Sequence, residues 1–255
     1  MGVEMPAVPV GSGKHPVLLV VISANELAAS TAFYSRLFGW QAQPLSAELT
    51  AIVPPGGPTI ALRGNIPAGF PGLVPYIGVV DVKAGLAAAV AAGGSIEREP
   101  WSVPMVGMLA RYRDPSGTIY GVTDTMTPGA VPRIPMPFGP NPKPVIGSIC
   151  SLEMFGADQA VTAKFFGDLY GWGSAVTMPQ FLAFDPGAGI GGVFQSHTPS
   201  LPAVAYIYVQ DVRATLDAID GAGGKRSADA MAVPGMACFG YFTDPSGTHM
   251  GLIGE

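Results

Sequence analysis

The sequence predicts an α+β protein made of two similar halves, each containing two modules of one strand, one helix and three further strands. The first observation is a repeat, because Asp-Pro-Ser-Gly occurs at Asp114 to Gly117 and returns 130 residues later at Asp244 to Gly247. The second is that other landmarks return in the same order, so that one long unit is present twice. These landmarks are Phe38-Gly39-Trp40 with Tyr170-Gly171-Trp172, Asp81-Val82 with Asp211-Val212, and Gly93-Gly94 with Gly223-Gly224.

The opening strand of each half is an apolar run. The run Val17 to Ile22 imitates a short signal peptide, but its counterpart Val145 to Leu152 lies in mid-chain, where no signal acts. We therefore expect a buried strand at both places.

A helix is predicted after each opening strand. Apolar residues lie on one helical face, and a glycine stands where a left-handed C-terminal cap belongs. These residues are Leu27, Thr31, Tyr34, Phe38 and Gly39 in the first half, and Val161, Phe165, Leu169 and Gly171 in the second.

The second module of each half follows the same plan. A strand from Val74 to Val80 leads into a helix with Asp81 as its N-cap, and Ala203 to Val209 leads into one that begins at Asp211. Asp-Pro-Ser-Gly suits a type I turn between antiparallel strands, here a hairpin. Further short strands are expected at Leu49 to Val53, Thr59 to Leu62, Phe181 to Phe184 and Ile190 to Phe194.

The repeat also divides the chain of 255 residues into domains. Residues 1–15 read as a flexible arm, 16–127 as the first domain, 128–144 as a proline-rich linker and 145–255 as the second domain. Each domain is long enough to bury a core of its own.

Composition limits the partners. The formal charge is −5 and no cluster of Lys and Arg is present, so we expect neither nucleic acid nor an anionic membrane as a partner. Charged residues make up only 12% and hydrophobic ones 48%, which favours an apolar cavity or an interface between domains or subunits, a homodimer included. Cys150 and Cys238 form no metal-type pair and are expected to be free thiols. We expect a soluble, cytoplasmic protein.

The ordered set of motifs resembles the vicinal oxygen chelate superfamily, which includes glyoxalases, bleomycin-resistance proteins and extradiol dioxygenases. The motifs are a helix that ends in Phe-Tyr-x-x-Leu-Phe-Gly-Trp, a strand that runs into Asp-Val, and a Tyr-x-Asp-Pro-Ser-Gly hairpin. Because the set occurs twice, the chain looks like a tandem two-domain member, hydroxylase-like or glyoxalase-like. The resemblance implies curled mixed sheets around a cavity and, in metal-dependent members, four ligands on one divalent ion.

This chain lacks the usual ligands at the positions that the resemblance assigns. The family's metal-binding Glu on the last strand would fall on Gly121 and Gly251. Two more of the four ligand positions fall near Leu19 and Pro75 in the first half and near Ser151 and Ala205 in the second. None of the residues at these three positions has a metal-binding side chain in either half. We expect no cofactor, with a divalent metal on unusual ligands as the alternative.

Glu153 and His249 are the candidate catalytic pair. Side chains two residues apart on a strand lie on the same face of the sheet. Glu153 therefore shares a face with Ser151, and His249 shares a face with Gly251, so both lie beside expected metal-ligand positions that lack a metal-binding side chain. A carboxylate beside an imidazole supports general acid/base chemistry. The alternative is that both are ordinary strand residues.

Aromatic residues are the candidate ligand-binding surface. Most belong to the core, and a minority lining a groove would suit a flat, apolar ligand. The candidates are Ser151, Tyr208, Trp101 and Phe239.

Three functions follow from these features. The first is a metal-independent lyase or isomerase that uses Glu153 and His249, the second a binding protein that sequesters a small organic molecule, and the third a scaffold for a partner. A metal-dependent glyoxalase or dioxygenase with unusual ligands is a further alternative, since fold does not fix function.

Overall fold

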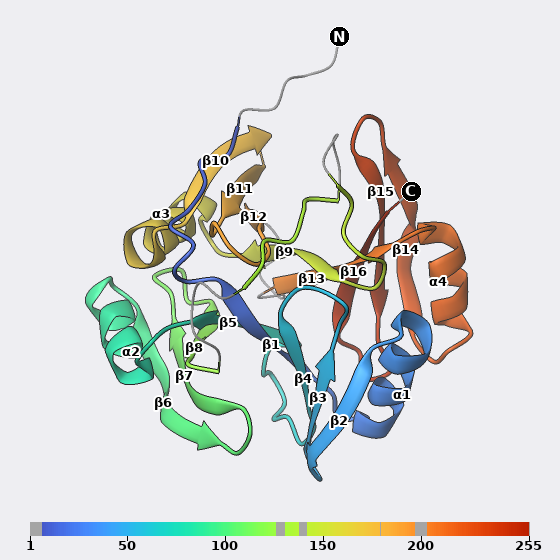
Figure 1. The fold of residues 1–255 in the computed structure, drawn as a ribbon, viewed down its shortest axis with the longest axis horizontal. Coiled ribbons are helices and arrows are strands. Elements are labelled where there is room, and N and C mark those ends of the chain that lie inside the picture. The colour runs from blue at the N-terminus through green and yellow to red at the C-terminus, as the bar shows by residue number, and fades with distance from the viewer. Residues whose placement is uncertain (1–6, 126–130, 138–141, 179, 197–202, 255) are drawn as a thin grey trace. The chain divides into compact units, whose positions relative to one another are not determined.

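Each half of the chain forms one eight-stranded mixed sheet with two helices (Figure 1). The structure, a computed structural model, describes residues 7–125, 131–137, 142–178, 180–196 and 203–254. This architecture confirms the predicted α+β class and the tandem arrangement of glyoxalase-like domains.

The strands of the first half follow the order β2-β3-β4-β1-β5-β8-β7-β6. Its elements are β1 (Val17–Ser23), α1 (Leu27–Phe38), β2 (Gln41–Ser46), β3 (Leu49–Val53), β4 (Thr59–Arg63), β5 (Leu73–Gly78), α2 (Val82–Ala91), β6 (Ser95–Val103), β7 (Gly107–Arg113) and β8 (Ile119–Thr123).

The second half repeats this order strand by strand as β10-β11-β12-β9-β13-β16-β15-β14. Its elements are β9 (Ile149–Phe155), α3 (Gln159–Tyr170), β10 (Gly173–Met178), β11 (Phe181–Asp185), β12 (Gly192–Gln195), β13 (Ala203–Val209), α4 (Val212–Asp220), β14 (Lys225–Val233), β15 (Ala237–Thr243) and β16 (His249–Gly254). The repeat seen in the sequence is therefore a repeat of topology.

Two compact units each combine segments from both halves. The first unit contains Met1–Leu19, Val74–Arg133 and Leu152–Ala203. The second contains Val20–Leu73, Ile134–Ser151 and Val204–Glu255, and in it α1 and α4 lie side by side (Figure 1). The domain boundaries 16–127 and 145–255 follow the chain rather than these units, and they stay a prediction.

The helix ends agree with the sequence. Gly39 and Gly171 adopt left-handed conformations with φ of 69° and 68°, as a C-terminal cap requires. The Asp81 carboxylate accepts hydrogen bonds from the backbone N–H of Lys83 at 2.8 Å and of Ala84 at 3.0 Å. The predicted apolar face of α3 was wrong at Val161, which is 42% exposed.

A hydrogen bond to a hairpin aspartate explains why Thr162 is buried on α3 in place of Val161. Thr162, the next residue after Val161, is buried because its hydroxyl donates to Asp114 Oδ2 at 3.1 Å. In the other unit, the Ser30 hydroxyl donates to Asp244 Oδ2 at 3.1 Å. The Asp-Pro-Ser-Gly turn of each half thus holds the first helix of the other half.

Burial raises the pKa of both hairpin aspartates. Desolvation is the main cause for Asp114 and Asp244, and hydrogen bonds to each carboxylate oppose it. For Asp244 the donors are the backbone N–H groups of Ser246 and Thr248 together with the hydroxyls of Ser30 and Tyr34. Each turn is therefore a buried polar junction as well as a hairpin.

The described part of the amino-terminal arm, residues 7–15, is hydrogen-bonded to the fold, and its flexibility stays a prediction. The Ser12 N–H donates to Gly171 O at 2.9 Å, and the Ser12 hydroxyl donates to Tyr170 O at 3.1 Å. The Trp172 indole N–H donates to His15 O at 2.8 Å. These bonds fix this part of the arm along the end of α3.

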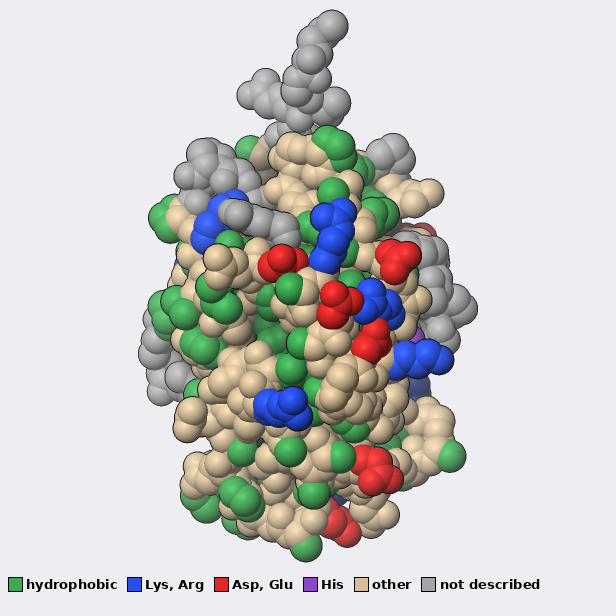
Figure 2. All heavy atoms as spheres, turned by 90° about the vertical axis from the view of Figure 1, so that its right-hand side faces the viewer, with side chains coloured by type: hydrophobic (Ala, Val, Ile, Leu, Met, Phe, Trp, Pro, Cys, Tyr) green, Lys and Arg blue, Asp and Glu red, His purple; other side chains and the backbone are tan. Residues whose placement is uncertain are grey.

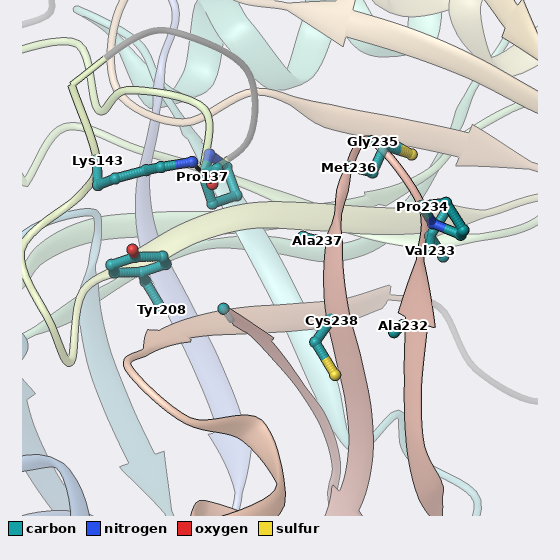
Figure 3. A pocket seen from close by; sticks show the side chains of 11 residues that line it. Pro137, Lys143, Tyr208, Ala232, Val233, Pro234, Gly235, Met236, Ala237 and Cys238 are labelled. Atoms are coloured by element: carbon teal, nitrogen blue, oxygen red, sulfur yellow. Dashed lines mark hydrogen bonds between the residues drawn. The ribbon is translucent and has the colours of Figure 1, made fainter. Parts of the chain in front are cut away.

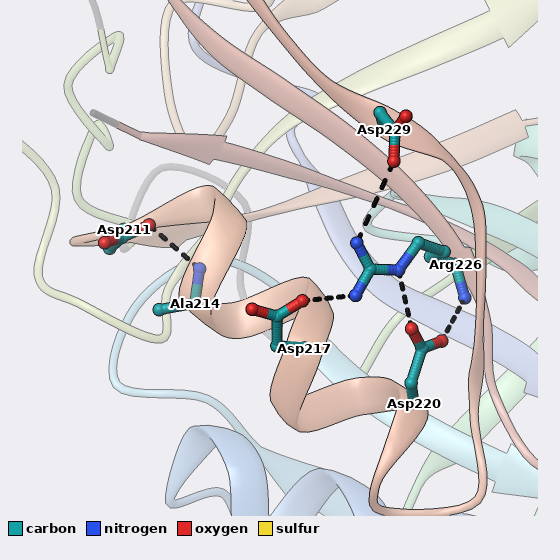
Figure 4. Close-up of polar contacts among 6 residues, drawn as sticks. All are labelled: Asp211, Ala214, Asp217, Asp220, Arg226 and Asp229. Atoms are coloured by element: carbon teal, nitrogen blue, oxygen red, sulfur yellow. Dashed lines mark hydrogen bonds and ion pairs between the residues drawn. The ribbon is translucent and has the colours of Figure 1, made fainter.

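Charged side chains are scattered on the surface. On the face drawn in Figure 2, the described Lys and Arg side chains alternate with Asp and Glu among apolar and other atoms. Figure 4 shows one such group, in which Arg226 on β14 pairs with Asp220 and Asp217 of α4. Its Nε lies 2.5 Å from Asp220 Oδ2, so this cation anchors a helix end. Among the described residues, no helix is long and apolar enough to cross a membrane.

Candidate ligand-binding site

A tyrosine ring covers the glycine at the expected last-strand ligand position in both sheets. Tyr76 pairs with Gly121 across β5 and β8, and Tyr206 pairs with Gly251 across β13 and β16. A Cβ atom added to Gly121 would lie 2.1 Å from Tyr76 Cδ1, and one added to Gly251 would lie 2.5 Å from Tyr206 Cδ1. No real Cβ tolerates such a contact, so the glycine is a condition for the ring to lie there.

The same register identifies the residues that share a face with these glycines. They are Tyr76 and Tyr206, each one residue after the expected positions near Pro75 and Ala205. The sequence could not show this, because it depends on the register between strands far apart in the chain.

The strand on the other side of the glycine, β7 in the first sheet and β15 in the second, distinguishes the two sheets. In the second sheet, β15 places Tyr241 opposite Gly251, and the Tyr206 hydroxyl donates to the Tyr241 hydroxyl at 2.6 Å. In the first sheet, β7 places Arg111 opposite Gly121, and Arg111 Nε lies 2.5 Å from Glu97 Oε2. The first sheet therefore carries an ion pair where the second carries two hydroxyls.

A divalent metal does not fit the side chains at these positions. Glycine offers no donor, and the neighbouring tyrosine rings occupy the space that a carboxylate side chain would need. Within the described ranges, no three His, Cys, Asp or Glu side chains gather closely enough to hold an ion.

Glu153 and His249 lie on different strands of the second sheet. Glu153 is half-buried on β9, where it pairs with Val193, and it makes further contacts. His249 is exposed as the first residue of β16, opposite Thr243. The two belong to different compact units, and their approach as an acid/base pair stays a prediction.

The other predicted ligand-binding residues are dispersed. Ser151 is half-buried on β9, and Phe239 packs edge-on against Tyr206 with ring centroids 6.1 Å apart. Trp101 lies on β6, where the guanidinium carbon of Arg98 is 3.9 Å from the ring centroid and that of Arg111 is 5.2 Å away. Two arginines thus cover Trp101, as expected of a structural cation–π contact.

Tyr208 lines a cavity of about 380 Å³ at one end of the second sheet (Figure 3). That volume lies within the range of small-molecule sites. The wall is largely apolar and is built by the turn between β14 and β15, the ends of β13 and β16, and the linker. The described lining residues are Pro137, Lys143, Tyr208, Ala232, Val233, Pro234, Gly235, Met236, Ala237, Cys238 and Gly254.

The backbone around the cavity is well fixed. The N–H of Met236 donates to Val233 O at 3.0 Å and closes the turn, in which Gly235 takes a φ of 78°. The N–H of Tyr208 donates to Ser148 O at 2.9 Å, and Tyr208 O accepts from Gly147 N–H at 2.8 Å. These hydrogen bonds define the backbone of the cavity wall.

Of the described lining residues, the sequence predicted only Tyr208 as ligand-binding. Lys143 belongs to the proline-rich linker, which reads as a connector, and Cys238 reads as a buried thiol. Cys238 is only 7% exposed, and Lys143 Nζ donates to Pro137 O at 3.0 Å. No local signal marks either residue, because the linker returns to the sheet only through the fold.

Known proteins are similar to this chain in sequence. Residues 17–119 match the sequence model of the Glyoxalase/Bleomycin resistance protein/Dioxygenase superfamily. A glyoxylase-like domain-containing protein of Didymella fabae is 31% identical over 117 residues, covering 40% of this chain and 91% of that protein. The CFP32 protein of Mycobacterium tuberculosis is 22% identical over 250 residues, covering 92% of each chain.

Solved structures share the fold. The Mn(II)-bound glyoxalase from Novosphingobium aromaticivorans matches 98% of this chain and 83% of its own, with a TM-score of 0.62 and 16% identity. The 2,3-dioxygenase LapB from Pseudomonas sp. KL28 matches 96% of this chain and 93% of its own, with a TM-score of 0.63 and 14% identity. These similarities concern the arrangement of the strands and helices.

Proposed function

Because the chain belongs to the glyoxalase/bleomycin resistance protein/dioxygenase superfamily, we propose that it binds a small, largely apolar organic molecule without the metal typical of that family. The observation that carries this proposal is the pair of tyrosine rings over Gly121 and Gly251. Metal-dependent members of the family are expected to hold a metal-binding glutamate at these two positions. The cavity beside Tyr208 is the binding site that we propose.

The physical basis is burial of apolar surface. A ligand that enters a largely apolar cavity of this size loses contact with water over most of its surface. The turn between Val233 and Ala237 is closed by a hydrogen bond from Met236 N–H to Val233 O, which reduces the ordering that binding requires.

Thermal unfolding with a library of small organic acids, amides and aromatic compounds tests the proposal. A true ligand at about 100 times its Kd should stabilise the protein by about 2.7 kcal/mol, which raises Tm by roughly 5–10 °C. The ligand should be recovered unchanged after incubation. A library without any stabilising compound would count against the site.

The repeat offers a matched control for this test. Val233→Trp places a large side chain in the cavity wall, whereas Val103→Trp makes the same change at the equivalent turn of the first half. Both valines are half-buried, and each accepts a turn hydrogen bond at 3.0 Å. We expect Val233→Trp to abolish the ligand-induced shift in Tm and Val103→Trp to retain it.

A second candidate function is a metal-independent lyase or isomerase in which Glu153 and His249 exchange protons with the ligand. The exposure of His249 favours it, because a ligand can reach an accessible imidazole and exchange a proton with it. Turnover of a stabilising compound that is lost in both Glu153→Gln and His249→Ala, with unchanged binding, would support this function. Ligand recovered intact at long times supports binding alone.

A further inference from the structure

The cavity beside Tyr208 has two chemically different ends. Lys143 and Tyr208 lie on one side of it, and the turn residues Val233, Pro234 and Met236 lie on the other (Figure 3). A ligand that fills the whole space must therefore match a polar end and an apolar end.

Lys143 supplies a positive charge that the described part of the wall leaves unbalanced. Its ammonium carries three donors, and the Pro137 carbonyl accepts one of them at 3.0 Å. The described lining includes neither Asp nor Glu. Arg226 differs, because Asp217 and Asp220 neutralise it (Figure 4).

Lys143 is exposed at the rim of the cavity, so solvent and salt screen its attraction for an anion. The apolar wall beside it is suited to bury the hydrocarbon part of a bound anion.

We infer that the ligand of this cavity is an apolar molecule with a single carboxylate group, which Lys143 binds while the hydrocarbon part lies against the turn between β14 and β15. This inference rests on the proposed function, since it specifies the ligand of the same site. The hydroxyl of Tyr208 lies at the carboxylate end and contributes to its polarity.

Matched pairs of compounds test the inference by calorimetric titration. The pairs are octanoate with octanamide and phenylacetate with phenylacetamide, which differ in charge but little in shape. We expect each acid to bind about 2- to 5-fold more tightly than its amide, as an ion pair at an exposed lysine implies. The affinity of the acids should fall as salt is added.

Variants assign this preference to Lys143. We expect Lys143→Gln to remove the difference between acid and amide, and Lys143→Arg to keep most of it. Lys225→Gln, at an exposed lysine of β14 outside the described lining, should change nothing.

The outcomes separate the two proposals. If acid and amide bind equally and Val233→Trp abolishes both, the cavity is the site and the carboxylate inference is wrong. If the acids are preferred and Lys143→Gln leaves that preference intact, the inference is also wrong. If Val233→Trp changes the binding of no compound in the library, the proposed function itself fails.

Discussion

The two sheets share one contact, a tyrosine ring over a glycine of the last strand, and differ in the residues around it. In both, a tyrosine ring lies over a last-strand glycine, Tyr76 over Gly121 and Tyr206 over Gly251. Next to it, the first sheet places the Arg111–Glu97 ion pair, whereas the second places the hydroxyl of Tyr241. Both halves thus fill the expected metal-ligand position in the same way and differ in the residues beside it.

A second difference concerns the cavity. At a spacing of 130 residues, Tyr208 and Gly254 correspond to Gly78 and Asp124 in the first half. A Cβ added to Gly78 would lie 2.5 Å from Leu18 Cδ1, and the Asp124 carboxylate accepts from Met108 N–H at 2.8 Å. The first half therefore has no tyrosine at the position of Tyr208 and a carboxylate at the position of Gly254.

The largest expected effect concerns the contact between the tyrosine ring and the last-strand glycine. Gly251→Glu should lower the free energy of unfolding by about 3 kcal/mol, because the new side chain collides with the Tyr206 ring and brings a charge into a buried strand. Gly121→Glu should behave alike. Urea denaturation measures both, and a neutral effect would mean that the ring yields easily.

The ion pair of the first sheet should come next. Arg111→Met leaves the Glu97 carboxylate without this partner, which should cost about 2–3 kcal/mol, since the Arg111 side chain is only 7% exposed. Tyr241→Phe, the counterpart in the second sheet, should cost about 1 kcal/mol, because a neutral hydrogen bond is lost. Equal costs in urea denaturation would remove the distinction between the two sheets.

The double variant Glu97→Gln with Arg111→Met isolates the ion pair. It should recover part of the stability lost in Arg111→Met, because no unpaired carboxylate remains. Failure to recover would assign the loss to the packing of Arg111 against Trp101 instead.

A smaller effect is expected from pH. Burial raises the pKa of Asp244 above the usual value of 3.8, so the contribution of this carboxyl group to stability is fully present below that value and declines as pH rises through the folded-state pKa. The free energy of unfolding of the wild type, relative to that of Asp244→Asn, should therefore rise as pH falls from neutral towards 3.8. Urea denaturation across this range checks the sign, and Asp114→Asn should behave in the same way.

The sequence was most informative where structure is local. The caps at Asp81, Gly39 and Gly171 and the Asp-Pro-Ser-Gly turns depend on a few consecutive residues, and the structure confirms them. The repeat predicted a common topology because both halves carry the same signals in the same order.

The site was less accessible because it depends on contacts between distant segments. The ring of Tyr206 reaches Gly251 through strand register, and Lys143 reaches the cavity through the path of the linker. The error at Val161 has the same origin, since Thr162 is buried only because Asp114, 48 residues earlier, accepts its hydrogen bond. Periodicity alone ranks valine above threonine at such a position.

A crystal structure of the protein with the most stabilising compound of the thermal screen tests the central claim most directly. The account predicts density for that compound between Lys143 and the turn at Val233 to Met236, with the rings of Tyr76 and Tyr206 still over their glycines. Density for the compound, or for a coordinated metal ion, at the place of either tyrosine ring would contradict it.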